Sequence, residues 1–373
     1  MSEWKTVRLG DYITEYSVKN KSNEDIPVYS VTNTQGFCTE YFSKDVSSKD
    51  KSNYKIVPRG CFAYNPSRIN VGSVDWQRYE DRVIVSPLYN VFKVSPELEN
   101  QYLYYFLKSD IGHTLITSKA EGSVRDNLKI TMLAEFSIPL PPLEEQKHIA
   151  AMLDKCTALV TKYKLMLEKY DTLIKSRFIE MFGDPVSNPM EWEKTELGNM
   201  CKEVRYGTSK PATENGKYTY LRMNNITFEG ELDLANTKTI DISDEELPKC
   251  SVQKGDILFN RTNSIELCGK TCLYKLDETM VIAGYIIRVR VNEKLNPQYV
   301  STFFNTKSIK KLLREMAKGA VNQANINAQE MQSIQIPVPP IALQNEYDSF
   351  VQQIDKSKFE MEKIVKLCYT TLM

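Results

Sequence analysis

One pattern, a proline-rich strand exit followed at once by a long helix, occurs twice in this chain. The first copy, IPLPPLEEQKHIAAMLDKC, begins at Ile138, and the second, IPVPPIALQNEYDSFVQQI, begins at Ile336. Proline lacks an amide hydrogen and cannot join a helix interior, so Pro142 and Pro340 fix where each helix can begin. The chain is therefore expected to have a duplicated architecture.

The apolar residues after both prolines follow a 3-4 spacing, which predicts a coiled coil. The first helix is expected over residues 143–182, roughly 60 Å long, and to end at Gly183-Asp184-Pro185. The predicted contact residues are Ile149, Met152, Cys156, Leu159, Tyr163, Met166, Tyr170 and Leu173, and then Tyr347, Phe350, Ile354, Ser357, Met361, Ile364, Cys368 and Thr371. One shift of 198 positions superimposes the two sets, so we expect the helices to pair, antiparallel if a pseudo-twofold axis relates the repeats. The alternative is that each helix packs only on its own globular domain.

The globular regions before the two hinges also repeat each other. The matching segments, in the same order, are WKTVRLG and WEKTELG, RGCFAYN and KGDILFN, NQYLYYFLKS and NPQYVSTFFNTKS, and GSVRDN and GAVNQAN. Short β-branched and aromatic runs broken by Gly, Asn and Asp predict strands, with amphipathic helices at residues 100–108 and 296–316. We therefore predict an α+β fold with two similar domains, residues 1–140 and 186–339, and two helical spacers, residues 141–185 and 340–373.

Composition excludes several classes of protein. The chain has 373 residues, 42% hydrophobic and 26% charged, with no run of about 18 apolar residues and no signal-peptide core, which predicts a cytoplasmic protein and no membrane partner. Lys+Arg and Asp+Glu balance at 48 each, so any basic surface for nucleic acid must be local. Eight scattered cysteines and two histidines form no zinc pattern, and Cys268 and Cys272 are expected to pack as reduced thiols.

Four of these segments together resemble a known family. The IPLPPLEEQ hinge, the helix end IEMFGDP, the W-x-x-x-x-L-G start of each half and the stretch GDILFNRTNSIELCGKT are similar to the specificity (S) subunits of type I restriction-modification enzymes, the HsdS family. The resemblance covers nearly the whole chain. It implies a noncatalytic subunit with two target-recognition domains, each of which reads one half of a bipartite site on double-stranded DNA, held apart by a helical spacer.

The same resemblance implies partners and cofactors. Such subunits bind two methyltransferase (M) subunits, which use S-adenosylmethionine, and in the full complex two restriction (R) subunits, which use ATP and Mg. No cofactor or metal is expected in this chain. Two readers on a rigid spacer suit a divided DNA site, because half-site separation must match a fixed distance in the protein.

Catalytic motifs are incomplete in this sequence. AYNPSRIN begins like an adenine methyltransferase tetrapeptide, but Ser67 and Arg68 replace its second proline and its aromatic residue. SIELCGKT has Ser264 where a phosphate-binding loop requires its first glycine. Both observations agree with a noncatalytic chain.

Polar loops at matching places in the two domains are the predicted DNA contacts, because Arg, Asn, Gln, Lys, Ser and Thr bind phosphates and base edges. In the first domain they are Asn65, Ser67, Arg68 and Asn70, and in a second loop Ser123, Arg125 and Asn127. In the second domain they are Arg261, Thr262 and Asn263, then Asn322, Gln323 and Asn325, and a small polar and basic patch of Thr208, Ser209, Lys210, Arg222 and Asn225.

Two alternatives stay open at the level of the sequence. Any single residue of these loops could be a solvated loop residue without a DNA contact. The whole chain could be a coiled-coil scaffold that binds only proteins, although this leaves the duplicated Arg/Asn loops unexplained. A stand-alone methyltransferase would require the isolated chain to bind S-adenosylmethionine.

Overall fold

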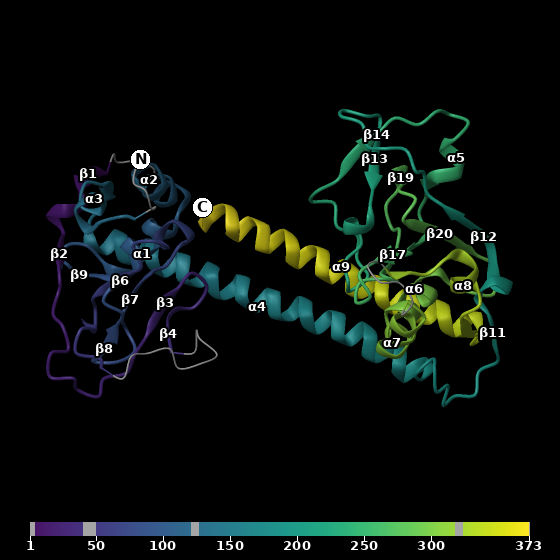
Figure 1. The fold of residues 1–373 in the computed structure, drawn as a ribbon, viewed down its shortest axis with the longest axis horizontal. Coiled ribbons are helices and arrows are strands. Elements are labelled where there is room, and N and C mark those ends of the chain that lie inside the picture. Colours follow the sequence, from purple (N-terminus) through teal and green to yellow (C-terminus); the bar gives the residue numbers. More distant parts are fainter. Residues whose placement is uncertain (1–3, 40–49, 121–126, 318–323, 373) are drawn as a thin grey trace. The chain divides into compact units, whose positions relative to one another are not determined.

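The chain forms two compact units, each described here by itself (Figure 1). The structure is a computed structural model that describes residues 4–39, 50–120, 127–317 and 324–372. The first unit comprises residues 1–163 and 362–373, and the second comprises residues 164–361. None of the helices in the described ranges has the length and apolar character needed to cross a membrane.

The first unit combines short strands with helices. Its strands are β1 (Lys5–Arg8), β2 (Ile13–Glu15), β3 (Ser30–Thr32), β4 (Gly36–Cys38), β5 (Lys55–Pro58), β6 (Phe62–Tyr64), β7 (Val74–Trp76), β8 (Arg82–Val85), β9 (Asn90–Val94) and β10 (Ser137–Leu140). Its helices, apart from the long ones, are α1 (Asn100–Lys108), α2 (Asp110–Ala120) and α3 (Ile130–Leu133). The central antiparallel sheet has the order β2-β9-β6-β7, and β1 pairs with β10 at the hinge.

One of the two core clusters of the first unit lies between this sheet and α1. Phe62 of β6 and Phe92 of β9 are direct neighbours in the sheet and stack with ring centroids 5.0 Å apart. Leu103 and Leu107 of α1 belong to the same buried cluster. The predicted helix over residues 100–108 is confirmed, and the Glu99 carboxylate caps its start by accepting from the amide of Tyr102 at 2.6 Å.

The second unit repeats this plan with additions. Its strands are β11 (Lys194–Glu196), β12 (Cys201–Tyr206), β13 (Tyr218–Leu221), β14 (Lys238–Ile240), β15 (Ser251–Val252), β16 (Ile257–Asn260), β17 (Thr262–Asn263), β18 (Thr271–Leu273), β19 (Met280–Ile282), β20 (Ile286–Val291), β21 (Ala324–Asn325) and β22 (Gln335–Pro337). Its shorter helices are α5 (Leu247–Cys250), α6 (Pro297–Asn305), α7 (Lys307–Met316) and α8 (Ala328–Gln332). One sheet has the order β12-β20-β16-β18, a second has the order β14-β13-β19-β15, and β11 pairs with β22.

The internal repeat and the α+β fold are confirmed by matching topology. The order β2-β9-β6-β7 corresponds strand by strand to β12-β20-β16-β18, and the hinge pair β1 with β10 corresponds to β11 with β22. One detail of the prediction was wrong, since residues 296–316 form two helices instead of one. The chain becomes extended at Thr306, whose hydroxyl caps α7 by accepting from the amide of Ile309. The spacing of the apolar residues continues across this break, so the sequence did not indicate that the helix is interrupted.

Two long helices, α4 (Leu143–Phe182) and α9 (Ile341–Leu372), follow the hinges. The predicted bounds of α4 are confirmed, and Gly183 ends it with the positive φ of 76° that glycine adopts without strain. Within the second unit the two helices run antiparallel. Their contacts join Asp171 to Lys358 at 2.8 Å, the Ile174 carbonyl to the Tyr347 hydroxyl at 3.2 Å, and Arg177 to Glu346 at 3.5 Å.

The predicted contact stripe is wrong by one residue at four positions, where the predicted side chain is exposed. Met152, Leu159, Leu173 and Ile364 are 48%, 40%, 44% and 39% exposed. The neighbour on the C-terminal side of each predicted residue turns inward instead, most clearly Val160 at 6% and Val351 at 1% exposed. The sequence could not choose between them, because each of these α4 sites carries two adjacent apolar residues.

The corrected stripe still obeys the repeat. The inward residues are Leu153, Val160, Leu167 and Ile174 in α4 and Val351, Lys358 and Val365 in α9, alternating with predicted positions such as Cys156, Tyr163, Tyr170, Ile354, Met361 and Cys368. Lys358 occupies the position that Val160 has in the other copy, and it pairs with Asp171 and with Glu231 at 3.2 Å. A single polar residue in an apolar seam favours one register over its neighbours.

A buried glutamine closes each hinge in the same way. Gln146 and Gln344, four residues after the last proline of each copy, are both fully buried. In each case the side-chain amide donates to two backbone carbonyls and its oxygen accepts from one backbone amide. The partners are Glu97 O (3.0 Å), Pro141 O (2.9 Å) and Glu99 N (2.8 Å) for Gln146, and Lys294 O (3.1 Å), Pro339 O (2.7 Å) and Asn296 N (2.8 Å) for Gln344. These three bonds tie the helix start to the globular domain before it.

The end of α4 belongs to the core of the second unit. Phe178 and Phe182, one turn apart, are buried beside Tyr299 of α6 and Tyr347 of α9. Their ring centroids lie 4.9 to 5.5 Å from those of the two tyrosines. The indole of Trp192 donates to the Phe182 carbonyl at 3.0 Å. This cluster anchors the helix on the second domain.

Candidate nucleic-acid interface

In the first unit the two predicted loops meet. The first loop follows β6: the Asn65 side chain accepts from the amide of Ser67 at 3.1 Å, and the loop continues into a 3-10 turn that ends at Gly72 with φ 89°. The Ser67 hydroxyl donates to the side-chain oxygen of Asn127 at 2.5 Å. Arg68 is exposed, and Asn70 is half-buried. Ser123 and Arg125 lie outside the described residues.

In the second unit the corresponding loops also meet, and through a corresponding residue. Strand β17 pairs with β21, so that Thr262 faces Asn325 and Asn263 faces Ala324. The side-chain oxygen of Asn325 accepts from Thr262 Oγ1 at 2.9 Å and from Arg261 Nε at 3.1 Å. Asn322 and Gln323 lie outside the described residues.

The asparagine that joins the two loops occupies the same position in both repeats. Asn127 and Asn325 are related by the shift that superimposes the two hinges. Each accepts a hydrogen bond from a hydroxyl of the first loop, Ser67 or Thr262. The repeat in the sequence was enough to find this correspondence, but only the structure shows that the two loops form one surface.

The patch at Thr208, Ser209 and Lys210 follows directly after β12. The hydroxyl of Tyr220 donates to the carbonyls of Thr208 and Lys210, at 3.2 and 3.0 Å, and fixes the backbone. Ser209 and Lys210 are exposed, and Lys210 forms an ion pair with Glu246 at 2.5 Å. This exposed pair is worth little to stability, so the lysine remains available to a phosphate.

Arg222 and Asn225 serve the protein itself. Arg222 is half-buried and donates through Nη2 to the Asn236 carbonyl at 2.9 Å. Asn225 is 2% exposed, accepts from the amide of Arg222 at 2.9 Å and donates to the carbonyl of Asp233 at 2.8 Å. The prediction of a DNA contact is therefore corrected for Asn225, because its amide holds a loop closed.

We expect Asn225→Ala to lower the free energy of unfolding by about 1–2 kcal/mol, because two backbone groups of the loop lose their hydrogen bonds to the buried amide. DNA sequence preference should not change. Denaturant titration and sequencing of bound DNA measure the two effects, with Asn224→Ala as control, since Asn224 is exposed beside it. An altered preference at unchanged stability would return Asn225 to the DNA-contacting set.

Sequence reasoning included Tyr206, the last residue of β12, only as the first residue of the polar and basic segment YGTSK and gave it no contact of its own. Its ring lies 4.9 Å from the guanidinium carbon of Arg261, and its hydroxyl accepts from the amide of Ala328 at 2.9 Å. Tyr206 is 42% exposed. The only signal in the sequence was its place before Gly207 in the patch segment YGTSK, which does not reveal that the ring supports an arginine of another loop.

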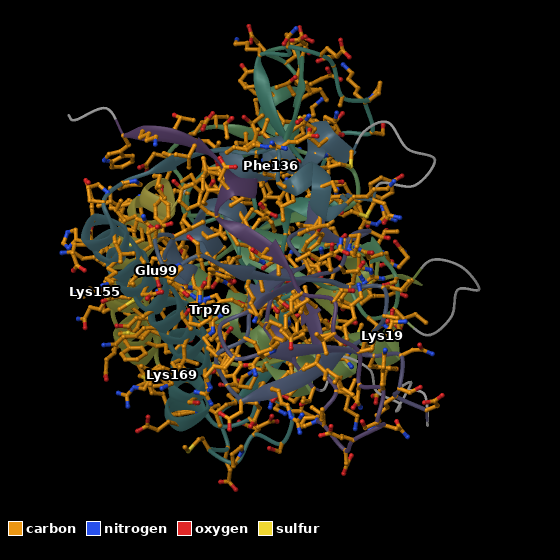
Figure 2. All side chains as sticks on the ribbon, turned by 90° about the vertical axis from the view of Figure 1, so that its left-hand side faces the viewer. Lys19, Trp76, Glu99, Phe136, Lys155 and Lys169 are labelled. Atoms are coloured by element: carbon orange, nitrogen blue, oxygen red, sulfur yellow. The ribbon has the colours of Figure 1, made fainter. Side chains whose placement is uncertain are left out.

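The first unit holds a different aromatic and cationic cluster, around Trp76, which Figure 2 labels. The Arg78 guanidinium lies 4.7 Å from the Trp76 ring and pairs with the buried Asp75 carboxylate at 2.6 Å. Burial raises the pKa of Asp75, and Arg78 opposes that rise. Because Arg78 already neutralises a buried acid, we regard it as structural.

The described residues contain no group of three or more His, Cys, Asp and Glu side chains able to hold a metal ion. Burial raises the pKa of Cys268 to about 11 and that of Cys272 to about 12, so both remain protonated thiols near neutral pH. Cys268 donates to the carbonyl of Arg261 at 3.2 Å. Cys268 thus helps to fix the backbone at Arg261, whereas Cys272 is buried in a core cluster of the second unit.

Comparison with known proteins identifies the family. The model of the type I restriction modification DNA specificity domain matches residues 1–169 and again residues 189–367. The chain belongs to this family. Each of the two matched regions contains one copy of the internal repeat.

The chain is similar to proteins named as specificity subunits of type I restriction enzymes. It is 27% identical over 280 residues to the EcoKI specificity subunit of Escherichia coli (strain K12), a match that covers 71% of this chain and 60% of the relative. It is 22% identical over 407 residues to the MjaVIII specificity subunit of Methanocaldococcus jannaschii, covering 100% of this chain and 92% of that one. The chain thus spans about three fifths of the length of the EcoKI subunit.

Solved structures share the fold of this chain. A chain from a structure on complex assembly and conformational transition of the type I R-M system superimposes with a TM-score of 0.57 at 18% identity, covering 100% of this chain and 97% of that chain. The S subunit of a type I restriction-modification system from M. genitalium gives a TM-score of 0.56 at 16% identity, covering 99% and 95%. At these identities the likeness concerns the fold alone.

Proposed function

We propose that this chain is the sequence-specific DNA-recognition subunit of a type I restriction-modification complex. In this proposal it works in the cytoplasm and is noncatalytic by itself. Each target-recognition domain reads one half of a bipartite site on double-stranded DNA. The alternative, a coiled-coil scaffold without DNA binding, leaves the paired polar loops without a use.

One observation carries the proposal: in both domains two polar loops far apart in sequence meet through the same asparagine position. Ser67 contacts Asn127 in one domain, and Thr262 and Arg261 contact Asn325 in the other. Each loop pair presents an arginine, Arg68 or Arg261, beside hydroxyl and amide groups. These are the side chains that bind phosphates and base edges.

The outer side of α4 supports docking of partner subunits. Met152, Leu159 and Leu173 repeat at heptad spacing on α4 and remain 40 to 48% exposed. Exposed apolar side chains at this spacing offer a surface that a partner protein would cover. In our proposal two methyltransferase (M) subunits, which bind S-adenosylmethionine, dock here. Two restriction (R) subunits, which use ATP and Mg, join the full complex.

The test is a gel shift with duplex DNA at low and moderate salt, with the chain alone and with its methyltransferase partner. We expect weak binding by the chain alone, stronger binding in the complex, and a steep loss with salt because several phosphates are neutralised. Protein complexes without any DNA binding would favour the scaffold. Methylation of DNA by the purified chain alone would contradict the noncatalytic role.

The two half-sites should respond to different arginines. Arg68→Ala should weaken recognition of one half and Arg261→Ala that of the other, each by about 1–3 kcal/mol if the arginine contacts a base. Competition between duplexes that carry one altered half at a time measures this. Loss of the same half in both variants would contradict one reader per domain.

A further inference from the structure

Both the backbone and the side chain of Arg261 are fixed by several contacts. It follows β16 directly, its amide donates to the Tyr285 carbonyl at 2.9 Å, and its own carbonyl accepts from the amide of Ile326 at 2.9 Å. The same carbonyl accepts from Cys268 Sγ. The backbone at this position is therefore fixed from several sides, and the side chain starts from a defined place.

The guanidinium is also fixed, on its face and at one nitrogen. Its face lies over the Tyr206 ring at 4.9 Å, and its Nε donates to Asn325 Oδ1 at 3.1 Å. Both supports are themselves held. The Tyr206 hydroxyl accepts from the Ala328 amide, and the same Asn325 oxygen accepts from Thr262 Oγ1. Stacking leaves the edge of a guanidinium free for hydrogen bonds.

That edge carries two nitrogens, Nη1 and Nη2, without a partner in the described part of the chain. No hydrogen bond or ion pair engages Nη1 or Nη2 of Arg261 among the residues that the structure describes. Two other arginines of this unit differ. Arg290 grips Asp256 through Nε and Nη2, at 2.7 and 3.0 Å, and the Nη2 of the buried Arg288 donates to Glu203 at 3.0 Å. Arg261 alone among these three is oriented without a carboxylate.

Two parallel donors on a rigid edge fit a ligand with two neighbouring acceptors. Guanine presents such a pair, O6 and N7, in the major groove of DNA, whereas the other bases do not. We propose that Arg261 reads a guanine in the half-site of the second domain, and that Tyr206 is a positioning residue that aims it. This inference rests on the proposed function and specifies the base.

A phosphate could accept from the same two donors, so the experiment must separate base from backbone. We would select the half-sites from a randomised duplex library with the full chain and its methyltransferase partner, and then replace each guanine in turn by 7-deazaguanine, which lacks N7. At one position this change should weaken wild-type binding several-fold and leave Arg261→Ala unaffected. Inosine at that position, which keeps O6 and N7, should bind like guanine.

Tyr206 has its own test. Tyr206→Leu removes the ring beneath Arg261, and guanine preference at that position should fall by roughly 5- to 150-fold, the range for losing a bidentate contact. Tyr206→Phe keeps the ring and loses only the hydrogen bond to the Ala328 amide, so most of the preference should remain, whereas a role of the hydroxyl alone predicts the same loss as in Tyr206→Leu. Tyr218→Leu is the matched control, since Lys217 lies 5.0 Å from that ring in the same domain.

The outcomes separate this inference from the proposed function. If no duplex is preferred over another, the proposed function itself fails. If duplexes are discriminated but Arg261→Ala weakens all of them equally, Arg261 binds phosphate and the inference is overturned. It is also overturned if 7-deazaguanine weakens wild-type and Arg261→Ala binding to the same extent at every position.

Discussion

Replacing Phe178 with alanine should destabilise the second unit by about 3–5 kcal/mol, the range for removing a fully buried aromatic ring. Phe178 is fully buried, and its centroid lies 5.0 Å from Phe182, 5.3 Å from Tyr299 and 5.5 Å from Tyr347. The ring joins α4 to α6 and α9, so the cavity would open where three helices meet.

Denaturant titration of the full chain measures the loss. Trp192 donates to the carbonyl of Phe182, so its fluorescence reports on this cluster. The matched control is Ile179→Ala, the next residue on the same helix, where the side chain is 42% exposed and the expected change is small. Equal effects of the two substitutions would show that α4 does not depend on this cluster for its anchorage.

A seven-residue insertion after Lys162 should change the DNA target without changing either half-site. Seven residues keep the seam in phase and lengthen α4 by about 10 Å, close to three base pairs of DNA. If the helices set the distance between the readers, the preferred gap between half-sites should grow by a few base pairs, or binding should be lost. A matching insertion in α9 would preserve the pairing of the helices.

Sequencing the methylated sites of the complex decides the result. The control is an insertion of equal length after Asp277, in the exposed turn between β18 and β19, which should leave the gap unchanged. An active α4 variant that keeps the original gap would limit the helices to a purely structural role.

The long helices were predictable because several signals agree over many residues. Proline fixes each start, Gly183 ends α4, and neither helix contains glycine or proline within. The face that turns inward was not predictable. At residues 159 and 160 both side chains are apolar, and a helix can bury either one by a small rotation. Only the packing against the partner helix selects Val160.

The candidate interface was predictable in outline and not in detail. Matching loops in two repeats pointed to Ser67, Asn127, Arg261 and Asn325, which the structure brings together in pairs. The prediction for Asn225 was wrong because the sequence does not distinguish a loop asparagine that faces solvent from one whose side chain closes the loop. The role of Tyr206 was missed because it depends on a contact across 55 positions of sequence.

The hydrogen bonds of the hinge glutamines determine which substitutions the joint between helix and domain tolerates. All six hydrogen bonds of Gln146 and Gln344 go to backbone atoms of the preceding domain and hinge, and none goes to a side chain. Every residue except proline offers the same backbone amide and carbonyl, whatever its side chain. The joint between helix and domain therefore tolerates replacement of almost every residue beyond it, so whole domains could be exchanged between relatives while the junction stays intact.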